Sequence, residues 1–267
     1  MQASLPMYDW PELRAATDAW WAALAQAFAA EGIRDVPARL VHDVPVPELW
    51  AAPELLLSQT CGYPLTHEWA GRLSLVATPH YAADGCSGPD YCSFVVVRRA
   101  DGLSSIEHLR GRSAAFNDPM SQSGYSALRS VVAPYARARQ FFGAVIETGS
   151  HLASLDAVMR GGADVCAVDS VVWALAGRHR PEFAEALEAL AVSPTAPGLP
   201  YVTRPDVAAG TLDRMRAALE RAFADPGLAE VRAALLLDGV SVPGAAAYDR
   251  ILDLERSARR QGYPALA

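Results

Sequence analysis

Apolar residues recur along this chain with two periods, and segments of the two kinds alternate from one end to the other. Short runs rich in Val, Ile and Leu predict strands, whereas apolar positions three and four residues apart predict helices. Leu13, Trp20 and Leu24 share one face of a helix predicted over residues 11–30, and Pro11 suits its first turn. This alternation is typical of α/β layers rather than of a helical bundle or a β-sandwich.

The same patterns predict where the chain changes from one lobe to another. Residues 84–90 are rich in Gly, Pro and Asp, and we expect the β-branched run at 93–97 to be a crossing strand. A discontinuous first lobe then comprises residues 1–92 and 196–267, and a second lobe comprises 93–195. Further strands are predicted at residues 3–7, 38–42, 55–60, 73–78, 113–116, 144–147 and 165–168. Helices are predicted to begin at Ser123, His151 and Ser170, and two later helices to cover residues 212–223 and 251–258. We expect the chain to return to the first lobe near residues 189–193.

Length and composition limit the class of protein. With 267 residues, 51% of them hydrophobic, the chain can bury one large core or two modest cores. No apolar stretch approaches the roughly 20 residues that span a bilayer, so membrane insertion is not expected. The first residues lack the basic start and the apolar segment of an export signal. We therefore expect a cytoplasmic protein, or a periplasmic one if this chain lacks its native leader.

Charge argues against a nucleic-acid partner. The formal net charge is −7, and no cluster of Lys and Arg alternates with aromatic residues. An anionic ligand would gain nothing from this overall charge. It would have to be held by local hydrogen-bond donors.

Cysteine and histidine spacing predicts neither a metal nor another cofactor. Cys86 and Cys92 are close enough in sequence to form a disulfide in an oxidising compartment. The alternative is that all four cysteines are reduced thiols. The five residues between Cys86 and Cys92 do not give the spacing of a zinc site. Cys166 lies in an apolar strand and is expected in the core. The six histidines are scattered, and no Walker-type or dinucleotide glycine loop is present.

Residues 118–125, Asp-Pro-Met-Ser-Gln-Ser-Gly-Tyr, place hydroxyls and backbone N–H groups where a helix is predicted to begin. Ser121 or Ser123 can cap this helix, and its unpaired N–H groups and dipole favour a phosphate-like group. Gly124 has no Cβ to block a close approach by an anion. The alternative is an ordinary serine cap without a ligand.

Other polar residues follow predicted strands in the same way. His151 begins a helix and Asp169 ends a strand, and the carboxyl ends of parallel strands meet at one sheet edge. Asp169 would accept a proton from the ligand or would cap the next helix through Ser170. Tyr8 and Tyr63 follow strands of the first lobe, where they would contact the ligand or serve in packing between the lobes.

Taken in order, these motifs resemble a known family. The run D-P-x-S-x-S-G is followed by Gly149-Ser150-His151, by the strand that ends at Asp169, and by a Ser-Pro-Thr-Ala-Pro turn at residues 193–197. This order resembles the substrate-binding proteins of phosphate, phosphite and phosphonate ABC transporters, which have the type 2 periplasmic-binding-protein fold. The resemblance covers most of the chain, and its motifs lie between residues 55 and 204.

The resemblance implies a two-lobed α/β fold with mixed, mainly parallel sheets flanked by helices and with two crossing hinge strands. It implies a monomeric solute-binding protein that closes on a small phosphonate- or phosphate-like oxyanion in a cleft between the lobes, possesses no enzymatic activity and serves an ABC permease. The ligand-binding residues that we predict are Tyr8, Tyr63, Ser121, Gln122, Ser123, Gly124, Tyr125, His151 and Asp169.

One departure from the family bears on the ligand. Relatives that hold aminoalkylphosphonates use acidic side chains for the amine, and the approximate counterparts here are Val171 and Leu199. We therefore expect a ligand without an amine, or one whose amine reaches Asp169. Leu199 and Trp173 would make part of the pocket apolar.

Two other functions remain open from the sequence. The first is a cytoplasmic enzyme on the same bilobed fold, with His151 as general base and Asp169 orienting it. The second is a cytosolic ligand sensor that reports to a partner by closing. A hydrolase built from Ser123, His151 and Asp169 is disfavoured because no G-x-S-x-G motif is present.

Overall fold

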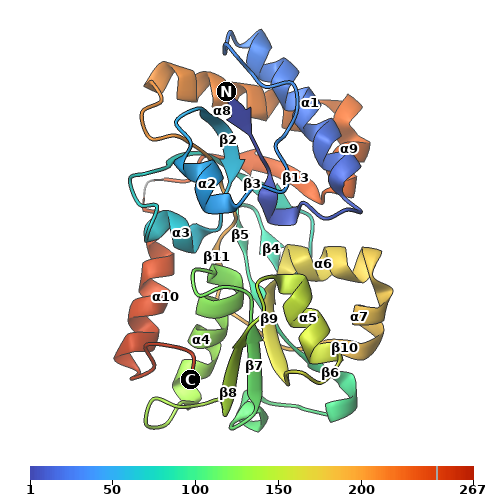
Figure 1. The fold of residues 1–267 in the computed structure, drawn as a ribbon, viewed down its shortest axis with the longest axis vertical. Helices are drawn as coiled ribbons and strands as arrows, with labels where there is room; N and C mark the ends of the chain where they lie inside the picture. The colour runs from blue at the N-terminus through green and yellow to red at the C-terminus, as the bar shows by residue number, and fades with distance from the viewer. Residues whose placement is uncertain (245) are drawn as a thin grey trace. The chain divides into compact units, whose positions relative to one another are not determined.

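The computed structural model describes residues 1–244 and 246–267, which fold as two compact units, each with its own sheet (Figure 1). Unit 1 and unit 2 are each made of more than one stretch of the chain. Unit 1 comprises Met1–Ala82, Ser87–Pro89 and Pro197–Ala247, and unit 2 comprises Ala83–Cys86, Asp90–Ala196 and Tyr248–Ala267.

The sheet of unit 1 has the strand order β1-β2-β12-β3-β13. Strands β1 and β2 are parallel, and β12 runs antiparallel to both β2 and β3. Helices α1 and α8 contact each other, and α8 also packs on β3 and β13. The strands of unit 1 are β1 (Gln2–Ala3), β2 (Leu55–Gln59), β3 (Ser74–Tyr81), β12 (Tyr201–Thr203) and β13 (Leu237–Ser241); its helices are η1 (Pro6–Tyr8), α1 (Arg14–Ala30), α2 (Val46–Ala51), α3 (Gly62–Thr66), α8 (Ala209–Ala224), η6 (Pro226–Leu228) and α9 (Ala229–Ala234).

The core of unit 1 forms where α1 and α8 meet the sheet. Trp20, Leu24 and Phe28 are fully buried on the predicted face of α1, beside Met215 of α8. The indole Nε1 of Trp20 donates a hydrogen bond of 3.2 Å to the hydroxyl oxygen of Tyr201, so the polar atoms of both rings are satisfied inside the core. The helical periodicity read from the sequence is thus confirmed.

Two strands predicted for unit 1 are wrong in extent or in kind. The strand predicted at residues 3–7 ends at Ala3, because Pro6 offers no backbone N–H and begins the 3-10 turn η1. Residues 38–42, all of them described, form no strand; the backbone N–H of Val41 donates to the carbonyl oxygen of Ala3, and side chains hold the rest of this segment.

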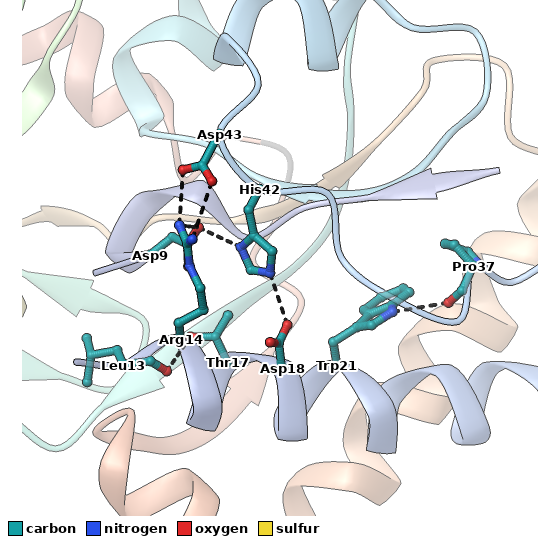
Figure 2. Close-up of polar contacts among 9 residues, drawn as sticks. All are labelled: Asp9, Leu13, Arg14, Thr17, Asp18, Trp21, Pro37, His42 and Asp43. Carbon is teal, nitrogen blue, oxygen red and sulfur yellow. Dashed lines mark hydrogen bonds and ion pairs between the residues drawn. The ribbon is translucent and has the colours of Figure 1, made fainter. Parts of the chain in front are cut away.

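Those side chains connect the segment to α1 (Figure 2). The indole Nε1 of Trp21 donates to the carbonyl oxygen of Pro37 over 3.1 Å. The ring nitrogens of His42 lie 2.7 Å from Oδ2 of Asp9 and 3.0 Å from Oδ1 of Asp18. The segment is therefore fixed by contacts that no strand pattern encodes.

The sheet of unit 2 has the strand order β10-β6-β9-β7-β8. Strand β7 is parallel to β8 and β9, whereas β6 runs antiparallel to β9 and to β10. The carboxyl ends of β7, β8 and β9 therefore lie at the same edge. The strands are β6 (Ser93–Arg98), β7 (Ser113–Phe116), β8 (Ala144–Glu147), β9 (Val165–Asp169) and β10 (Leu187–Val192); the helices are η2 (Arg99–Asp101), η3 (Ile106–Leu109), η4 (Gln122–Ser126), α4 (Ala127–Val132), η5 (Ala133–Tyr135), α5 (His151–Met159), α6 (Ser170–His179), α7 (Pro181–Ala186) and α10 (Asp249–Arg260).

The C-terminal segment corrects the predicted division of the chain. Residues 248–267 were expected in the first lobe, but α10 and the residues after it belong to unit 2. Tyr263 and Leu266 are buried in the same core as Val95 and Leu128. The carbonyl oxygen of Ala267 accepts hydrogen bonds from two backbone N–H groups at residues 141 and 142. An amphipathic pattern shows that a helix packs, but it does not show on which unit.

A third, small sheet is built from the segments where the chain passes from one unit to the other. Its strand order is β11-β5-β4, and each strand has two residues. The cysteines at positions 61, 86, 92 and 166, all of which the structure describes, are free thiols. None of the described helices is long and apolar enough to cross a membrane. The three strands are β4 (Cys86–Ser87), β5 (Asp90–Tyr91) and β11 (Ala196–Pro197).

Candidate functional site

A helical segment follows β7. It begins with a single π-helical turn, η4, and continues as α4. Ser121 caps this segment, because its Oγ accepts a hydrogen bond of 3.0 Å from the backbone N–H of Gly124. The carbonyl oxygen of Ser121 accepts from Ser126 N–H, five residues on. The N–H of Ser123 precedes this first helical bond, so the helix does not use it.

The second predicted serine has a different partner. Oγ of Ser123 lies 2.8 Å from Nε2 of His151 and 3.5 Å from Oγ of Ser121. His151 is brought there by α5, whose first turn is capped by Oγ of Ser150 after a left-handed turn at Gly149. Of the two possible caps left open by the sequence, Ser121 is therefore the cap, and Ser123 is bonded to the histidine.

Asp169 completes a cluster at the carboxyl ends of three neighbouring strands. Its Oδ1 accepts a hydrogen bond of 2.8 Å from Val172 N–H and so caps α6. Its Oδ2 lies 3.6 Å from Nε2 of His151, and the side chain is only 1% exposed. Ser123 follows β7, His151 follows β8 and Asp169 ends β9, so the parallel pairing of these strands brings the three side chains together.

The electrostatic environment keeps His151 neutral. Burial lowers the pKa of its imidazole, and the raising effects of the Asp169 carboxylate and of the Ala167 carbonyl do not overcome it. A neutral imidazole has one N–H donor and one acceptor nitrogen. Within residues 1–244 and 246–267, no group of three or more His, Cys, Asp or Glu side chains could hold a metal ion.

Asn117 lies beside this cluster, although no pattern in the sequence predicted it. This residue directly follows β7, and its Oδ1 is buried and finds no hydrogen-bond partner among the described residues. A Cβ on Gly124 would lie 1.9 Å from that Oδ1 and 3.1 Å from Cε1 of His151. A side chain at position 124 would therefore force the Asn117 amide or the turn to shift. The available signal was the position of Asn117 at a strand end, beside the serine motif.

Gln122 and Tyr125 are the two other predicted contacts in this turn. Gln122 is buried, with 1% of its surface exposed. The ring of Tyr125 packs edge-on against Phe116 at 5.2 Å, and its hydroxyl oxygen accepts from the backbone N–H of Leu266. The side chain of Tyr125 is therefore engaged in packing, and its predicted ligand contact is a backbone N–H.

Two predicted ligand contacts lie in unit 1. The ring of Tyr8 packs edge-on against Tyr81 at 5.6 Å, and the ring of Tyr63 stacks on His67 at 3.7 Å. Both tyrosines are buried. These contacts give each ring a place in unit 1, and the ligand roles of the two residues remain predictions.

The two positions at which the resemblance suggested acidic residues are buried and apolar. Val171 is 1% exposed in the first turn of α6, and Leu199 is 6% exposed in unit 1. Trp173, on α6, packs at 6.4 Å against the ring of Phe94. Neither Val171 nor Leu199 can neutralise an ammonium group.

Comparisons with known proteins identify the family of this chain. The model of a family described as "ABC transporter, phosphonate, periplasmic substrate-binding protein" matches residues 54–248, more than half of the chain. No curated protein matches the sequence at a significant level.

Three solved structures are similar to this chain. The binding protein component of an ABC phosphonate transporter from Pseudomonas aeruginosa has a TM-score of 0.76 at 17% identity, over 98% of this chain and 87% of that one. PhnD1 from Prochlorococcus marinus, in complex with methylphosphonate, has a TM-score of 0.75 at 15% identity, over 97% of both chains. A Xanthomonas citri protein bound to chloride ion has a TM-score of 0.74 at 15% identity, over 98% of both chains. At these identities the likeness establishes the fold, and it confirms the predicted α/β periplasmic-binding-protein architecture.

Proposed function

This chain belongs to the family of periplasmic substrate-binding proteins of phosphonate ABC transporters, and we propose on this basis that it binds a small phosphonate- or phosphate-like oxyanion through the serine turn (residues 121–125), His151 and Asp169. The observation that carries the proposal is the 2.8 Å contact between Ser123 Oγ and His151 Nε2, beside a helix start capped by Ser121. The contact holds a hydroxyl and an imidazole next to a backbone N–H that the helix does not use.

These donors are sufficient for useful affinity. A hydrogen bond to a charged oxygen contributes roughly 1.5–3 kcal/mol, and binding at about −8 kcal/mol corresponds to a micromolar dissociation constant. The two hydroxyls, the backbone N–H groups of residues 123 and 125 and the imidazole provide enough donors, after the cost of association. Gln122 lies in the same turn and is included in the proposed site.

Asp169 favours a ligand that carries a proton. A carboxylate 3.6 Å from His151 repels a fully ionised anion, but it can accept a hydrogen bond from a protonated oxyanion. Phosphate and phosphonate groups retain a proton in part near neutral pH, whereas sulfate does not. With Val171 and Leu199 in place of acidic side chains, the proposed ligand has no amine.

Ligand entry requires motion. The Ser121 and Ser123 residues are 5% and 3% exposed, so an oxyanion reaches their hydroxyls only when the segments that cover them move. Hinge closure, with Tyr8 and Tyr63 as additional ligand contacts, is part of the proposal. So are a permease partner, a monomeric state and a periplasmic location, the last of which the family description supports.

The geometry disfavours the enzyme that the sequence left open. In a Ser-His-Asp triad the carboxylate bonds Nδ1 while the serine bonds Nε2, so that the histidine can relay a proton. Here Asp169 and Ser123 both approach Nε2. Asp169 therefore does not orient the opposite nitrogen, and binding without chemical change is the function that this arrangement favours.

Isothermal titration calorimetry with methylphosphonate, phosphate, phosphite and sulfate tests the proposal. Replacing Ser121 and Ser123 together by Ala should weaken binding of the preferred oxyanion by roughly 2–5 kcal/mol, or about thirtyfold and more. Ser130→Ala is the matched control, because that hydroxyl donates to the carbonyl oxygen of Ala127 within α4. Unchanged affinity in a folded double variant refutes the site, and a product found by mass spectrometry after incubation refutes the binding-only function.

A further inference from the structure

Unit 1 contains a cavity of about 570 Å³ that the proposed oxyanion site does not use. It lies between the end of α1, the start of β2, the segment after β12 and the first turns of α8. Every residue that lines it belongs to unit 1. Its volume is within the roughly 300–1,000 Å³ typical of small-molecule sites.

Three arginines line this cavity, Arg34, Arg204 and Arg214. Neither Arg34 nor Arg214 has a carboxylate partner within ion-pair distance in the part of the chain that the structure describes. Arg214 is held instead by a hydrogen bond of 2.9 Å from its Nη2 to Oγ1 of Thr211. Two cationic side chains without an anionic partner create a local positive potential.

The acidic groups nearby are already engaged or exposed. Arg204 pairs with Asp206 at 3.2 Å, but the carboxylate of Asp206 is 79% exposed and the pair is correspondingly weak. Glu31 also lines the cavity, and its carboxylate is paired with Arg221. The cavity therefore keeps an excess of positive charge.

The floor of the cavity is apolar. Ile33, Leu56 and Met215 line it and are 6%, 2% and 0% exposed as parts of the unit 1 core. An apolar floor below two unpaired guanidinium groups is suited to a molecule with an anionic end and a hydrocarbon end. Guanidinium forks bind carboxylate and phosphate oxygens bidentately, which fixes the orientation of such a molecule.

The cavity is at the opposite edge of the unit 1 sheet from the predicted ligand contacts. Met1 precedes β1 and Leu56 is the second residue of β2, so the cavity lies at the amino ends of these parallel strands. Tyr8 and Tyr63 follow the carboxyl ends of the same two strands. The two features of unit 1 are therefore separate.

We propose that this cavity is a second binding site, for a small organic anion that joins one carboxylate or phosphate group to an apolar portion. Arg34 and Arg214 bind the anionic group, and the apolar portion lies over the buried side chains of Ile33, Leu56 and Met215. The site is independent of the oxyanion site in unit 2 and does not rest on the function proposed above.

The methionines provide a direct test. The chain has five, and Met215 lines the cavity, whereas Met120 adjoins the serine turn and Met159 ends α5. Protein with ¹³C-labelled methionine methyl groups is titrated with hexanoate and, separately, with phenyl phosphate. The Met215 signal should shift saturably while the Met159 signal stays in place. Shifts confined to Met120, or no saturable shift at about 10 mM of either probe, overturn the proposal.

Variants identify the groups responsible. Arg34→Gln with Arg214→Gln should weaken probe binding about tenfold or more, since charge-assisted bonds are lost from two exposed side chains. Arg39→Gln, an exposed unit 1 arginine outside the cavity, should leave binding unchanged, as should the double replacement of Ser121 and Ser123. Equal binding by the Arg34 and Arg214 variant overturns the assignment. Inorganic phosphate that binds at Met215 as tightly as either probe overturns the role of the apolar floor.

Discussion

The Nε2 atom of His151 lies 2.8 Å from the hydroxyl oxygen of Ser123. The same nitrogen lies 3.6 Å from a carboxylate oxygen of Asp169, so one ring atom faces both a hydroxyl and an anion. When the proton of the neutral ring is on Nε2, this single N–H cannot satisfy both groups at full strength. A bound oxyanion that carries a proton would offer Asp169 a further donor and release that N–H for Ser123 or for the ligand.

Asp169→Asn should change which oxyanions bind. The amide oxygen of asparagine can still accept from Val172 N–H, so the cap of α6 is kept while the negative charge is removed. We expect the affinity for sulfate to rise relative to that for methylphosphonate at about pH 7, because the repulsion of a fully ionised anion is gone. Competition calorimetry measures the ratio.

Asp169→Ala separates the charge from the cap. It removes both, so it should cost about 1 kcal/mol of unfolding free energy that Asp169→Asn does not cost. A ratio of sulfate to methylphosphonate affinity that is the same in Asp169→Asn and in the original protein would show that the carboxylate does not select the ligand.

Gly124→Ala should be harmful because of Asn117. The new methyl carbon would lie 1.9 Å from Oδ1 of Asn117, so the amide or the helical turn must move. We expect a loss of about 1–3 kcal/mol in unfolding free energy, as for other overpacked sites, together with weaker oxyanion binding. Urea unfolding and calorimetry give the two values.

A double-mutant cycle identifies the cause. Asn117→Ala removes the colliding oxygen, so adding it to Gly124→Ala should restore part of the lost stability. If the two changes are simply additive, the clash with Asn117 is not what makes glycine necessary at position 124.

Sequence patterns predicted unit 2 more closely than unit 1, for a physical reason. The predicted bounds of β7 and β8 and the predicted start of α5 are confirmed, because each element combines a local apolar pattern with clear turn residues. Residues 38–42 carry a strand-like pattern, and Val41 N–H donates to the carbonyl oxygen of Ala3 in β1, but the segment forms no strand. They are held by His42 and by contacts to α1, which depend on tertiary structure.

The candidate site shows the same division. Ser121, Ser123, His151 and Asp169 lie in recognisable positions at strand ends, and the structure brings them together in unit 2. Asn117 belongs to no motif, and its contact with Gly124 arises only when the turn folds back on β7. Packing partners across a fold are not encoded in local periodicity.

Tyr125→Phe tests whether that side chain serves the ligand or the fold. Its hydroxyl oxygen accepts a hydrogen bond of 3.2 Å from Leu266 N–H, and Leu266 is 5% exposed. Losing this acceptor should cost about 1–2 kcal/mol of unfolding free energy. Oxyanion affinity should be almost unchanged, since the backbone N–H of residue 125 remains.

Tyr135→Phe is the control for that substitution, because the ring of Tyr135 packs against Phe141 in the same unit. It should leave the link between Leu266 and residue 125 intact. A loss of oxyanion affinity in Tyr125→Phe greater than about tenfold, without a matching loss of stability, would mean that the hydroxyl contacts the ligand.

In unit 1, His42 is placed between two carboxylates, those of Asp9 and Asp18 (Figure 2). Arg14 forms ion pairs with Asp9 and with Asp43. The surroundings of the imidazole therefore contain both positively and negatively charged side chains. Burial by itself lowers the pKa of His42, but the hydrogen bonds to Asp9 and Asp18 and their charges outweigh it, so the pKa is raised above its usual range. The protonated ring is thus the form that the fold prefers.

The stability that His42 contributes should therefore depend on pH with a definite sign. Because the pKa is higher in the folded than in the unfolded state, the contribution is fully present below about pH 6.5 and is lost as pH rises through the folded pKa. We expect the difference in unfolding free energy between the original protein and His42→Gln to be largest at about pH 5.5 and to shrink towards about pH 8.5, measured by urea unfolding. Burial lowers the pKa of His80 and of His151, so these two histidines make the free energy of unfolding change with pH in the opposite direction. Both are present in the original protein and in His42→Gln, so the difference between these two proteins isolates the contribution of His42. Asp18→Asn removes one partner and should flatten this dependence; a difference that instead grows as pH rises would contradict the raised pKa.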